Sequence, residues 1–524
     1  MSVKAGTVEQ RGESWAQGKK PGGGYGPVRL VKLLRGLEGK VDAKSVAAHG
    51  DMEIQEIAYD SRSVKQGTLF VAIRGEKTDG NNFVNDAVAR GSIAIASEQA
   101  IPGTLPANFP WIQVADARKT LAIAAANYFG RPAGVLKLIG VTGTNGKTTT
   151  AYLVDSILRA AGCEVGLLGT IGHRLVRETV AAANTTPESL DLQRFLADVV
   201  RAGGTHAVLE ASSHALAMDR LWGCPFAVAI FTNLTRDHLD YHKTFDEYFA
   251  AKRRLFEGTG AAAPAAAVVN RDDEYGKQLT GLATRTLSYG FDPGADITTR
   301  KPVLSFSGIE CTVETPLGKI EIRSKLVGRT NVYNILAAIG AGVALDLSRE
   351  VIAAGIAQLA AVPGRFERVD LGQGFVVVVD YAHTDDALRN LMASAKELNP
   401  NGRLITLFGC GGDRDRTKRP LMGEVAGRAS DVVVLTSDNP RSEDPLLIIN
   451  DVIVGLQRTN AKCIIEPDRK KAIERAIDEA RSGDTVLLAG KGHETYQVLR
   501  DRTIDFDDRE VAREVLRGHG FGGN

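Results

Sequence analysis

The run GVTGTNGKTTT at residues 140–150 constrains this chain more than any other segment. It follows the apolar stretch 135–139, which we expect to form a buried strand, and it precedes the start of a predicted helix at 151–154. A glycine-rich turn between a strand and a helix N-terminus directs backbone N–H groups and the helix dipole at phosphate. In that geometry Lys147 reaches the terminal phosphates and Thr148 binds Mg²⁺. The segment therefore predicts a P-loop in an α/β domain, and with it the use of ATP.

The spacing of this loop differs from the standard P-loop pattern. Five residues instead of four separate Gly140 from Gly146. The alternative interpretation is an ordinary glycine-rich turn without a ligand, but Gly-Lys-Thr at 146–148 stands where strand and helix should meet, which favours the P-loop. The expected nucleotide-binding residues of the loop are Gly143, Thr144, Asn145, Gly146, Lys147, Thr148 and Thr149.

Composition places the chain among ordinary globular proteins. Its 524 residues are 44% hydrophobic and 24% charged, and at ~150 residues per domain they predict about three domains. The net charge of +1 gives no bulk attraction to nucleic acid or to an acidic membrane. Five scattered cysteines form no CxxC pair, which argues against a disulfide framework or a zinc site and predicts a reducing compartment.

No targeting or membrane signal stands out. No apolar run reaches membrane-spanning length, and residues 1–26 lack the apolar centre of a signal peptide. We expect residues 1–26 to be a disordered tail and the protein to be cytoplasmic.

The alternation of apolar and polar segments predicts an α/β protein of three domains. Residues 27–115 are expected to form a small α/β domain, with a helix at 82–90. Residues 116–362 are expected to form a central doubly wound sheet that carries the P-loop, and residues 363–524 a Rossmann-like α/β domain. Strands of the central and third domains are predicted at 135–141, 164–169, 206–210, 226–232, 265–269, 375–380, 403–409, 431–436 and 485–490.

Two loops of the central domain carry metal-binding side chains. Glu210 ends the predicted strand 206–210, where a carboxylate close to a P-loop can bind Mg²⁺; the alternative is an acid on a surface loop. The loop after strand 226–232 holds Asn233, Asp237, His238, Asp240 and His242. These side chains can bind a metal, or they can be ordinary polar surface.

The helix that follows contains an unusual lysine. Phe245, Phe249 and Phe256 share one helical face, and Lys252 lies on the same face. A lysine of this kind can extend its amine to solvent. Alternatively, desolvation lowers its pKa, and the neutral amine takes up CO₂ as a carbamate that can bind a metal.

The loops of the third domain are also rich in polar groups. The segment 409–420 lacks the third glycine of a dinucleotide fingerprint, which argues against a nicotinamide site. In the segment 438–445, Asp444 can cap a helix with Pro445 in its first turn. That local role leaves Arg441 unexplained, and its guanidinium is a good partner for a carboxylate. Glu494 can accept a hydrogen bond from an ammonium group.

Together these motifs resemble the Mur ligase family, ATP-dependent amide-forming enzymes of peptidoglycan synthesis. The P-loop, EASSH at 210–214 and DHLDYH at 237–242 resemble the family's nucleotide, metal and substrate loops. Lys252 falls where the family carries a carbamylated lysine. The resemblance implies catalytic roles for Lys147, Glu210, His238 and Lys252. It also implies two Mg²⁺ ions, bound by Thr148, Glu210, His238 and carbamylated Lys252. Further contacts to ATP are implied for Asn334, Arg365 and His383.

The resemblance extends to the two other substrates. DNPR at 438–441 is similar to the family's signature for meso-diaminopimelate, which implies a site formed by Arg414, Asp438, Asn439, Pro440, Arg441, Gly490 and Glu494. The implied site for UDP-N-acetylmuramoyl-L-alanyl-D-glutamate consists of Ser61, Glu76, Lys77, Thr78, Thr185, Thr186, Ser212 and Arg220. Met218 stands where some relatives use a polar contact and is left out, and Asp385 replaces a common proline.

The resemblance implies that an amide bond forms through an acyl-phosphate intermediate. We expect the protein to be a monomer. Two rivals stay open at this stage. A folylpolyglutamate synthetase shares the P-loop and fold but needs neither DNPR nor the first domain. A P-loop switch or motor would leave the loops of the third domain unexplained.

Overall fold

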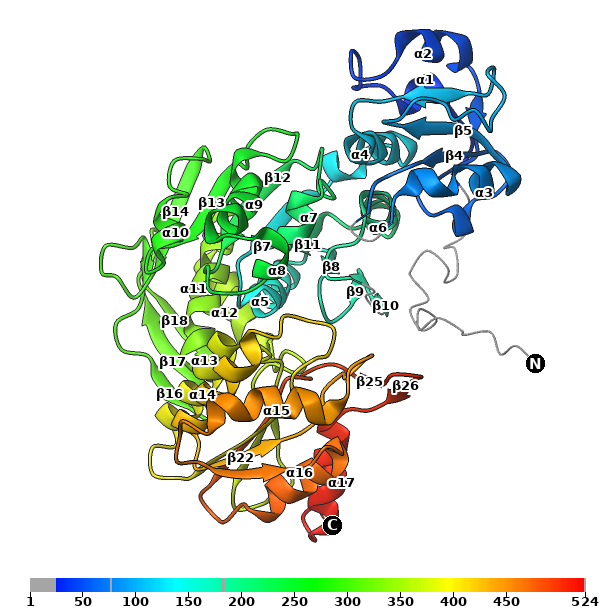
Figure 1. The fold of residues 1–524 in the computed structure, drawn as a ribbon. Helices are drawn as coiled ribbons and strands as arrows, with labels where there is room; N and C mark the ends of the chain where they lie inside the picture. Colours follow the sequence, from blue (N-terminus) through cyan, green and yellow to red (C-terminus); the bar gives the residue numbers. More distant parts are fainter. Residues whose placement is uncertain (1–24, 76–77, 181–183, 523–524) are drawn as a thin grey trace, which may run out of the picture.

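The computed structural model describes residues 25–75, 78–180 and 184–522, with Asp240 described by its backbone alone. Almost all of the tail expected at 1–26 lies outside these residues. Three parallel or mostly parallel sheets follow one another along the chain, coloured blue, cyan to green, and yellow to red in Figure 1. The predicted α/β class is therefore confirmed, while the exact domain boundaries stay predictions.

The first sheet is parallel and has four strands in sequence order. Its strands are β3 (Glu56–Ala58), β4 (Thr68–Val71), β5 (Ser92–Ser97) and β6 (Trp111–Gln113). The helix predicted at 82–90 is α3 (Val84–Ala89), entered through a 3₁₀ turn. The remaining elements of this part are β1 (Val28–Arg29), α1 (Leu30–Leu33), α2 (Ala43–His49), β2 (Glu53–Ile54) and α4 (Ala117–Tyr128).

The core of this first part is shared with the next. Leu190 and Ala197 of α6 (Ser189–Arg201) belong to the same apolar cluster as α1, β4, β5 and α4. Tyr59 also donates a hydrogen bond of 2.7 Å to Asp191 of α6. The loops of the first sheet are thereby held next to the central sheet.

The central sheet has nine strands in the order β10-β9-β8-β11-β7-β12-β13-β14-β15. The P-loop strand lies in its middle, which is why its residues are apolar on both faces. Five strands match the predicted ones: β7 (Lys137–Thr142), β8 (Val165–Leu168), β11 (His206–Glu210), β12 (Phe226–Phe231) and β13 (Ala266–Asn270). Both edges extend beyond the prediction, with β9 (His173–Leu175), β10 (Glu178–Val180), β14 (Arg285–Gly290) and β15 (Ile297–Thr298).

Helices cover both faces of the central sheet, as doubly wound folds require. One apolar cluster joins the sheet to α5 (Lys147–Ala160), α11 (Arg329–Ala344) and α12 (Arg349–Gln358). A second cluster on the opposite face includes α6 and α9 (Phe245–Glu257). Short helices α7 (Ser213–Ala217), α8 (Leu239–His242) and α10 (Glu274–Lys277) follow strand ends, and β16 (Val303–Ser305), β17 (Gly308–Val313) and β18 (Ile320–Ser324) form a separate antiparallel sheet.

The last sheet has the order β19-β20-β24-β21-β22-β23. Its strands are β19 (Glu367–Val369), β20 (Val376–Asp380), β21 (Leu404–Phe408), β22 (Val432–Leu435), β23 (Lys462–Ile465) and β24 (Thr485–Ala489). Helices α13 (Asp385–Leu398), α14 (Lys418–Ala429) and α15 (Pro445–Leu456) pack on one face, with α16 (Arg469–Asp478) and α17 (Asp508–Gly518) on the other. Asp444 caps α15 and Pro445 opens it, as predicted. A hairpin, β25 (Tyr496–Val498) and β26 (Thr503–Asp505), follows β24.

The four inner strands of this sheet are parallel, so their carboxyl ends lie at one edge. That edge faces the centre of the molecule (Figure 1). Within the described part of the chain, no helix is long and apolar enough to cross a bilayer.

Candidate active site

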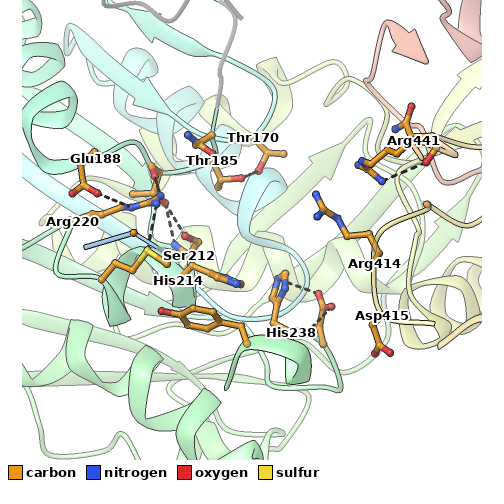
Figure 2. A pocket seen from close by; sticks show the side chains of 18 of the residues that line it. Thr170, Thr185, Glu188, Ser212, His214, Arg220, His238, Arg414, Asp415 and Arg441 are labelled. Atoms are coloured by element: carbon orange, nitrogen blue, oxygen red, sulfur yellow. Dashed lines mark hydrogen bonds and ion pairs between the residues drawn. The ribbon is translucent and has the colours of Figure 1, made fainter. Parts of the chain in front are cut away.

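A cavity of about 1370 Å³ lies where loops from all three sheets converge. Ser61 and Thr78 line it from the first sheet, and Arg220 and His238 line it from the central sheet. The third sheet contributes Arg414, Asp438, Asn439, Arg441, Gly490 and Glu494. Figure 2 shows Arg220 with Glu188 on one side of this cavity and Arg414 with Arg441 on the other. Glu76 and Lys77, expected beside Thr78, lie outside the described residues.

The P-loop joins β7 to α5 next to this cavity. Gly143 has φ of 145°, and a Cβ there would lie 1.8 Å from the hydroxyl of Thr232. Gly146 caps α5 in a left-handed conformation, with φ of 86°, so both positions need glycine. The loop after β12 holds the turn, because Asn233 Oδ1 accepts from the Asn145 backbone N–H at 2.9 Å.

Thr148 and Glu210 form the first predicted metal pair. The Thr148 hydroxyl donates to Glu210 Oε2 at 3.0 Å. Thr170 also donates to Glu210, from its backbone N–H at 2.9 Å and from its hydroxyl at 3.0 Å. Glu210 is only 1% exposed, so the surface-acid interpretation is wrong. Its carboxylate points toward the helix N-terminus, where a cation and phosphates can meet it.

Lys252 is completely enclosed, which excludes the interpretation of an amine that extends to solvent. Its side chain is 1% exposed, and Nζ donates to the carbonyl of Gly143 at 2.8 Å. Burial, and then the charge of Lys147, lower the pKa of Lys252 well below its usual value. A buried amine of this kind is populated in the neutral form that reacts with CO₂.

The surroundings of Lys252 correct one detail of the sequence prediction. Phe249 and Phe256 are buried on the helical face, but Phe245 is 37% exposed and does not desolvate the amine. The ring beside the amine belongs to Tyr248, whose centroid lies 4.3 Å from Lys252 Nζ. The sequence carried a signal for this neighbour, since residues four apart share a helical face.

His238 lies in the loop after β12 with a left-handed backbone, φ of 54°. Its Nε2 is 3.4 Å from a carboxylate oxygen of Asp237, and the ring packs edge-on against Tyr248. Lys252 and His238 therefore both pack against the ring of Tyr248. The described residues contain no group of three or more His, Cys, Asp or Glu that could hold a metal, so any cation here would need further ligands from substrates.

Four predicted substrate residues are tied together near Glu210. The Thr186 hydroxyl donates to the Glu210 carbonyl at 2.6 Å and to the Ser212 hydroxyl at 3.2 Å. Arg220 donates to the Thr186 carbonyl at 2.9 Å, and the hydroxyl of Thr185 contacts that of Thr170 at 3.0 Å. Sequence reasoning missed Thr170, Glu188 and Arg118, because only the tertiary fold brings them into this cluster; Glu188 pairs with both Arg118 and Arg220.

The third sheet provides a pair of arginines. Arg441 has φ of 51° and donates to the Gly412 carbonyl at 2.8 Å. Burial lowers the pKa of Arg441, and the charge of Arg414 lowers it further. Two like-charged guanidinium groups that converge on a cavity form a site for an anion, because a bound carboxylate would offset both the burial and the repulsion.

Opposite charges stand beside the arginines. Asp438 and Glu494 both line the cavity. Glu494 Oε2 already accepts from Asn439 Nδ2 at 2.9 Å, so this carboxylate is held in one position. A Cβ at Gly412 would lie 1.9 Å from the carbonyl oxygen of Pro440, so this position requires glycine. Gly490 has a φ of 108°, a backbone conformation that favours glycine. The pocket thus offers a cationic and an anionic side within one group of loops.

The nucleotide loop is joined to the third sheet by direct contacts. Arg365 donates to the Thr148 hydroxyl at 3.2 Å, and Asn145 Nδ2 donates to Asp386 at 3.0 Å. Within the part that carries the third sheet, Lys418 of α14 donates to the His383 carbonyl at 3.0 Å. Asn334 instead lies beneath the P-loop, where its Oδ1 accepts from the Thr150 hydroxyl at 3.3 Å. Asp385 is the first residue of α13, which Thr384 caps, and it lies 3.9 Å from the guanidinium of Arg389 in the next turn.

Three family models match successive parts of this chain. They are the Mur ligase family catalytic domain at residues 53–129, the Mur ligase middle domain at 141–342, and the Mur ligase glutamate ligase domain at 364–492. The matches follow the three sheets in order.

Curated relatives and solved structures agree with these models. The chain is 59% identical over 470 residues to a UDP-N-acetylmuramoyl-L-alanyl-D-glutamate–2,6-diaminopimelate ligase of Solibacter usitatus, covering 90% of this chain and 94% of the relative. It is 46% identical over 510 residues to the enzyme of the same name from Geobacter metallireducens, covering 94% and 98%. A solved structure with that name matches with a TM-score of 0.64 at 33% identity, covering 90% of this chain and 96% of the other. With these likenesses spanning nearly its whole length, the chain belongs to the Mur ligase family.

Proposed function

We propose that this protein is the ATP-dependent ligase that joins meso-diaminopimelate to the D-glutamyl γ-carboxylate of UDP-N-acetylmuramoyl-L-alanyl-D-glutamate, a step of peptidoglycan precursor synthesis. The observation that carries the proposal is one cavity that joins Arg414 and Arg441 to the loops around Glu210. The relatives that cover almost the whole chain carry the name of this activity.

The cavity accounts for two substrates. Its end at Ser61 and Thr78 suits the uridine nucleotide, and Thr185, Thr186, Ser212 and Arg220 suit the muramoyl dipeptide. Diaminopimelate carries ammonium and carboxylate groups at both ends. The arginine pair fits its distal carboxylate, and Asp438 with Glu494 fits an ammonium.

The P-loop accounts for ATP. The backbone N–H groups at the start of α5 suit the phosphates, and Lys147 now donates to the carbonyls of Gly143 and Thr144 at 2.9 and 2.8 Å. These are weak partners for an ammonium, and ATP phosphate oxygens would replace them. Asn334, Arg365 and His383 complete the nucleotide site in this proposal.

The reaction proceeds in two substitutions. The γ-carboxylate of the D-glutamyl residue attacks the γ-phosphorus of ATP, and ADP leaves with the electron pair of the broken P–O bond. The amine of diaminopimelate then attacks the carbonyl of the acyl phosphate, and inorganic phosphate leaves as the amide forms and the amine loses a proton. The protein positions the carboxylate, the triphosphate and the amine, and it neutralises the negative charge that develops as the phosphoryl group is transferred.

The residues present fit Mg²⁺, which prefers oxygen ligands and usually keeps several waters or phosphate oxygens. Thr148 and Glu210 would hold one ion, and His238 with the carbamate of Lys252 would hold a second. When bound, the ions offset repulsion between the carboxylate and the triphosphate. As a neutral amine, Lys252 would add to CO₂: the nitrogen lone pair forms the C–N bond, one C=O π bond opens to C–O⁻, and a proton leaves, so that a neutral amine becomes an anionic carbamate.

The proposed location is the cytoplasm, because ATP and a nucleotide-linked precursor are the substrates. The proposed oligomeric state is a monomer. A folylpolyglutamate synthetase would not need the first sheet or the arginine pair, and a P-loop switch would not need the amino-acid pocket. We therefore favour the ligase.

The test is phosphate release by the purified protein with ATP and Mg²⁺. We expect release only when the UDP-muramoyl dipeptide and diaminopimelate are both present. Release without an amino acid would favour a switch, and release with a folate and glutamate would favour the other ligase. A panel with lysine, ornithine and glutamate in place of diaminopimelate defines the amine specificity.

A further inference from the structure

Lys491 is a fully buried cation that the proposed reaction does not use. Its side chain is 0% exposed, and it lies in the loop after β24 between Gly490 and Glu494. It does not line the cavity, whereas both of those neighbours do. A lysine without access to water needs anionic or polar partners, and its partners show what it supports.

Among the described residues, the ammonium of Lys491 has three hydrogen-bond partners, all in the amino-acid pocket, and the ring centroid of Tyr496 lies 5.8 Å from it. Nζ lies 3.3 Å from Asp438 Oδ1, 3.2 Å from Asn439 Oδ1 and 3.2 Å from Glu494 Oε2. Asp438 and Asn439 follow β22, whereas Glu494 follows β24, so the lysine joins two loops that are about fifty residues apart in sequence.

The same network fixes the orientation of the pocket side chains. Asn439 Oδ1 also accepts from the Val498 backbone N–H at 2.9 Å, while its Nδ2 donates to Glu494 Oε2. Two donors therefore converge on Oε2 of Glu494. Among the described residues no donor reaches Oε1 of Glu494 within hydrogen-bond distance, which leaves that oxygen for an incoming ammonium.

Charge balance gives Lys491 a second effect. Asp438 and Glu494 are 11% and 14% exposed, so two carboxylates stand close together with little water. Burial alone would raise the pKa of Asp438, but Lys491 and then Arg469 outweigh it, and the pKa is lowered. Without the lysine, Asp438 would lose the largest charge that opposes its burial, so its pKa would rise and it would retain a proton more readily.

We propose that Lys491 is a positioning residue for the amine-accepting side of the pocket: it joins Asp438 to Glu494 and fixes the free oxygen of Glu494 toward the substrate ammonium. This inference rests on the proposed function, because it names how the same pocket recognises its amino acid. Lys491 acts through the two carboxylates and does not touch the substrate.

Other charged and titratable groups face this network and bear on its pH dependence. They are Arg469 of α16, His383 and Tyr381 after β20, Arg441 after β22, and Tyr496 of β25. Burial lowers the pKa of His383 and raises the pKa of both Tyr381 and Tyr496 above the usual value. None of them changes charge between about pH 7 and 9, so a pH effect in this range reports the ionisation of Asp438.

The experiment compares Lys491→Met and Lys491→Gln with the wild-type enzyme. Methionine has a similar length without the charge, and glutamine keeps a donor without the charge. The Michaelis constant for diaminopimelate is measured from about pH 7 to 9 at saturating ATP and UDP-muramoyl dipeptide. The ratio of the variant constant to the wild-type constant cancels titration of the substrate amine.

We expect this ratio to be about tenfold or more at about pH 7 and to fall toward about pH 9, as the proton that Asp438 retains in the variant leaves. The Michaelis constant for ATP should stay unchanged, which shows that the variants are folded and bind nucleotide. Lys471→Met is the matched control, because Lys471 is exposed on α16 in the same part of the chain; it should change neither constant.

A ratio that is elevated but constant with pH would overturn the proposal, since a merely structural role predicts that result. So would an unchanged Michaelis constant, or loss of folding in both variants by thermal unfolding. Failure of the wild-type enzyme to use diaminopimelate would instead contradict the proposed function, so the two failures are distinguishable.

Discussion

Lys147 and Lys252 donate to the same acceptor, the carbonyl oxygen of Gly143, at 2.9 and 2.8 Å. Two ammonium groups that converge on one neutral oxygen repel each other, and burial lowers the pKa of each lysine. Conversion of Lys252 to a carbamate would replace this repulsion with attraction. The carbonyl of Gly143 thus connects the P-loop to Lys252, the lysine that the proposed reaction requires as a carbamate.

Lys252→Ala should lose most ligase activity, because it removes a metal ligand from the site with His238. Short carboxylates such as acetate or propionate added to the assay should restore part of the activity by taking the place of the carbamate. The matched control is Arg253→Ala, which should retain activity, because Arg253 is the next residue of the same helix and is half exposed. A crystal structure at neutral pH that shows a bare ammonium at Lys252, from a fully active preparation, would contradict the prediction.

Lys147→Ala should lower kcat by about 10²–10³-fold, the usual cost of removing one preorganised group from a developing charge. The fold should survive, since the hydrogen bonds of the lysine amine to described residues all go to carbonyls of its own loop. Thermal unfolding and steady-state phosphate release measure both effects. Normal turnover in this variant would exclude the P-loop from the chemistry.

Arg441→Ala should raise the Michaelis constant for diaminopimelate and narrow its advantage over L-lysine. Lysine lacks the distal carboxylate, and a buried guanidinium left without its partner carries a desolvation penalty. Discrimination of this kind reaches about 10⁴-fold in sites built around the missing group. Both amino acids are compared in the wild type and the variant at fixed ATP. An unchanged preference would show that Arg441 is not the selector.

Glu443→Gln should lower stability by about 1–2 kcal/mol at about pH 7. Glu443 accepts from buried Arg419 at 2.8 and 2.9 Å, and this hydrogen bonding lowers the pKa of Glu443 to about 2. Since the folded pKa is depressed, the stabilisation is present above about pH 4.5 and is lost as pH falls toward about 2.

The difference in thermal midpoint between this variant and the wild type should therefore narrow below about pH 4.5. Glu514→Gln is the matched control, because its pair with Lys470 is exposed on both sides; it should have little effect at any pH. A constant difference for Glu443→Gln across the acid range would contradict the linkage.

Much of the fold follows from local sequence. Apolar runs such as 206–210 and 485–489 became strands because they are apolar on both faces, as buried parallel strands are. The cap formed by Asp444 and Pro445 also needed only neighbouring residues. The edge hairpin of β9 and β10 was missed, because short polar strands with partly exposed side chains give no strong periodic signal.

The sequence by itself determined the P-loop, the alternation of strands and helices, and the chemical types of the site residues, because these depend on residues close together in the chain. Only the tertiary structure decided that Glu210 is buried, that Tyr248 lies beside the amine of Lys252, and that Lys491 joins Asp438 to Glu494. Burial and charge pairing depend on which distant segments meet, and no local pattern specifies that.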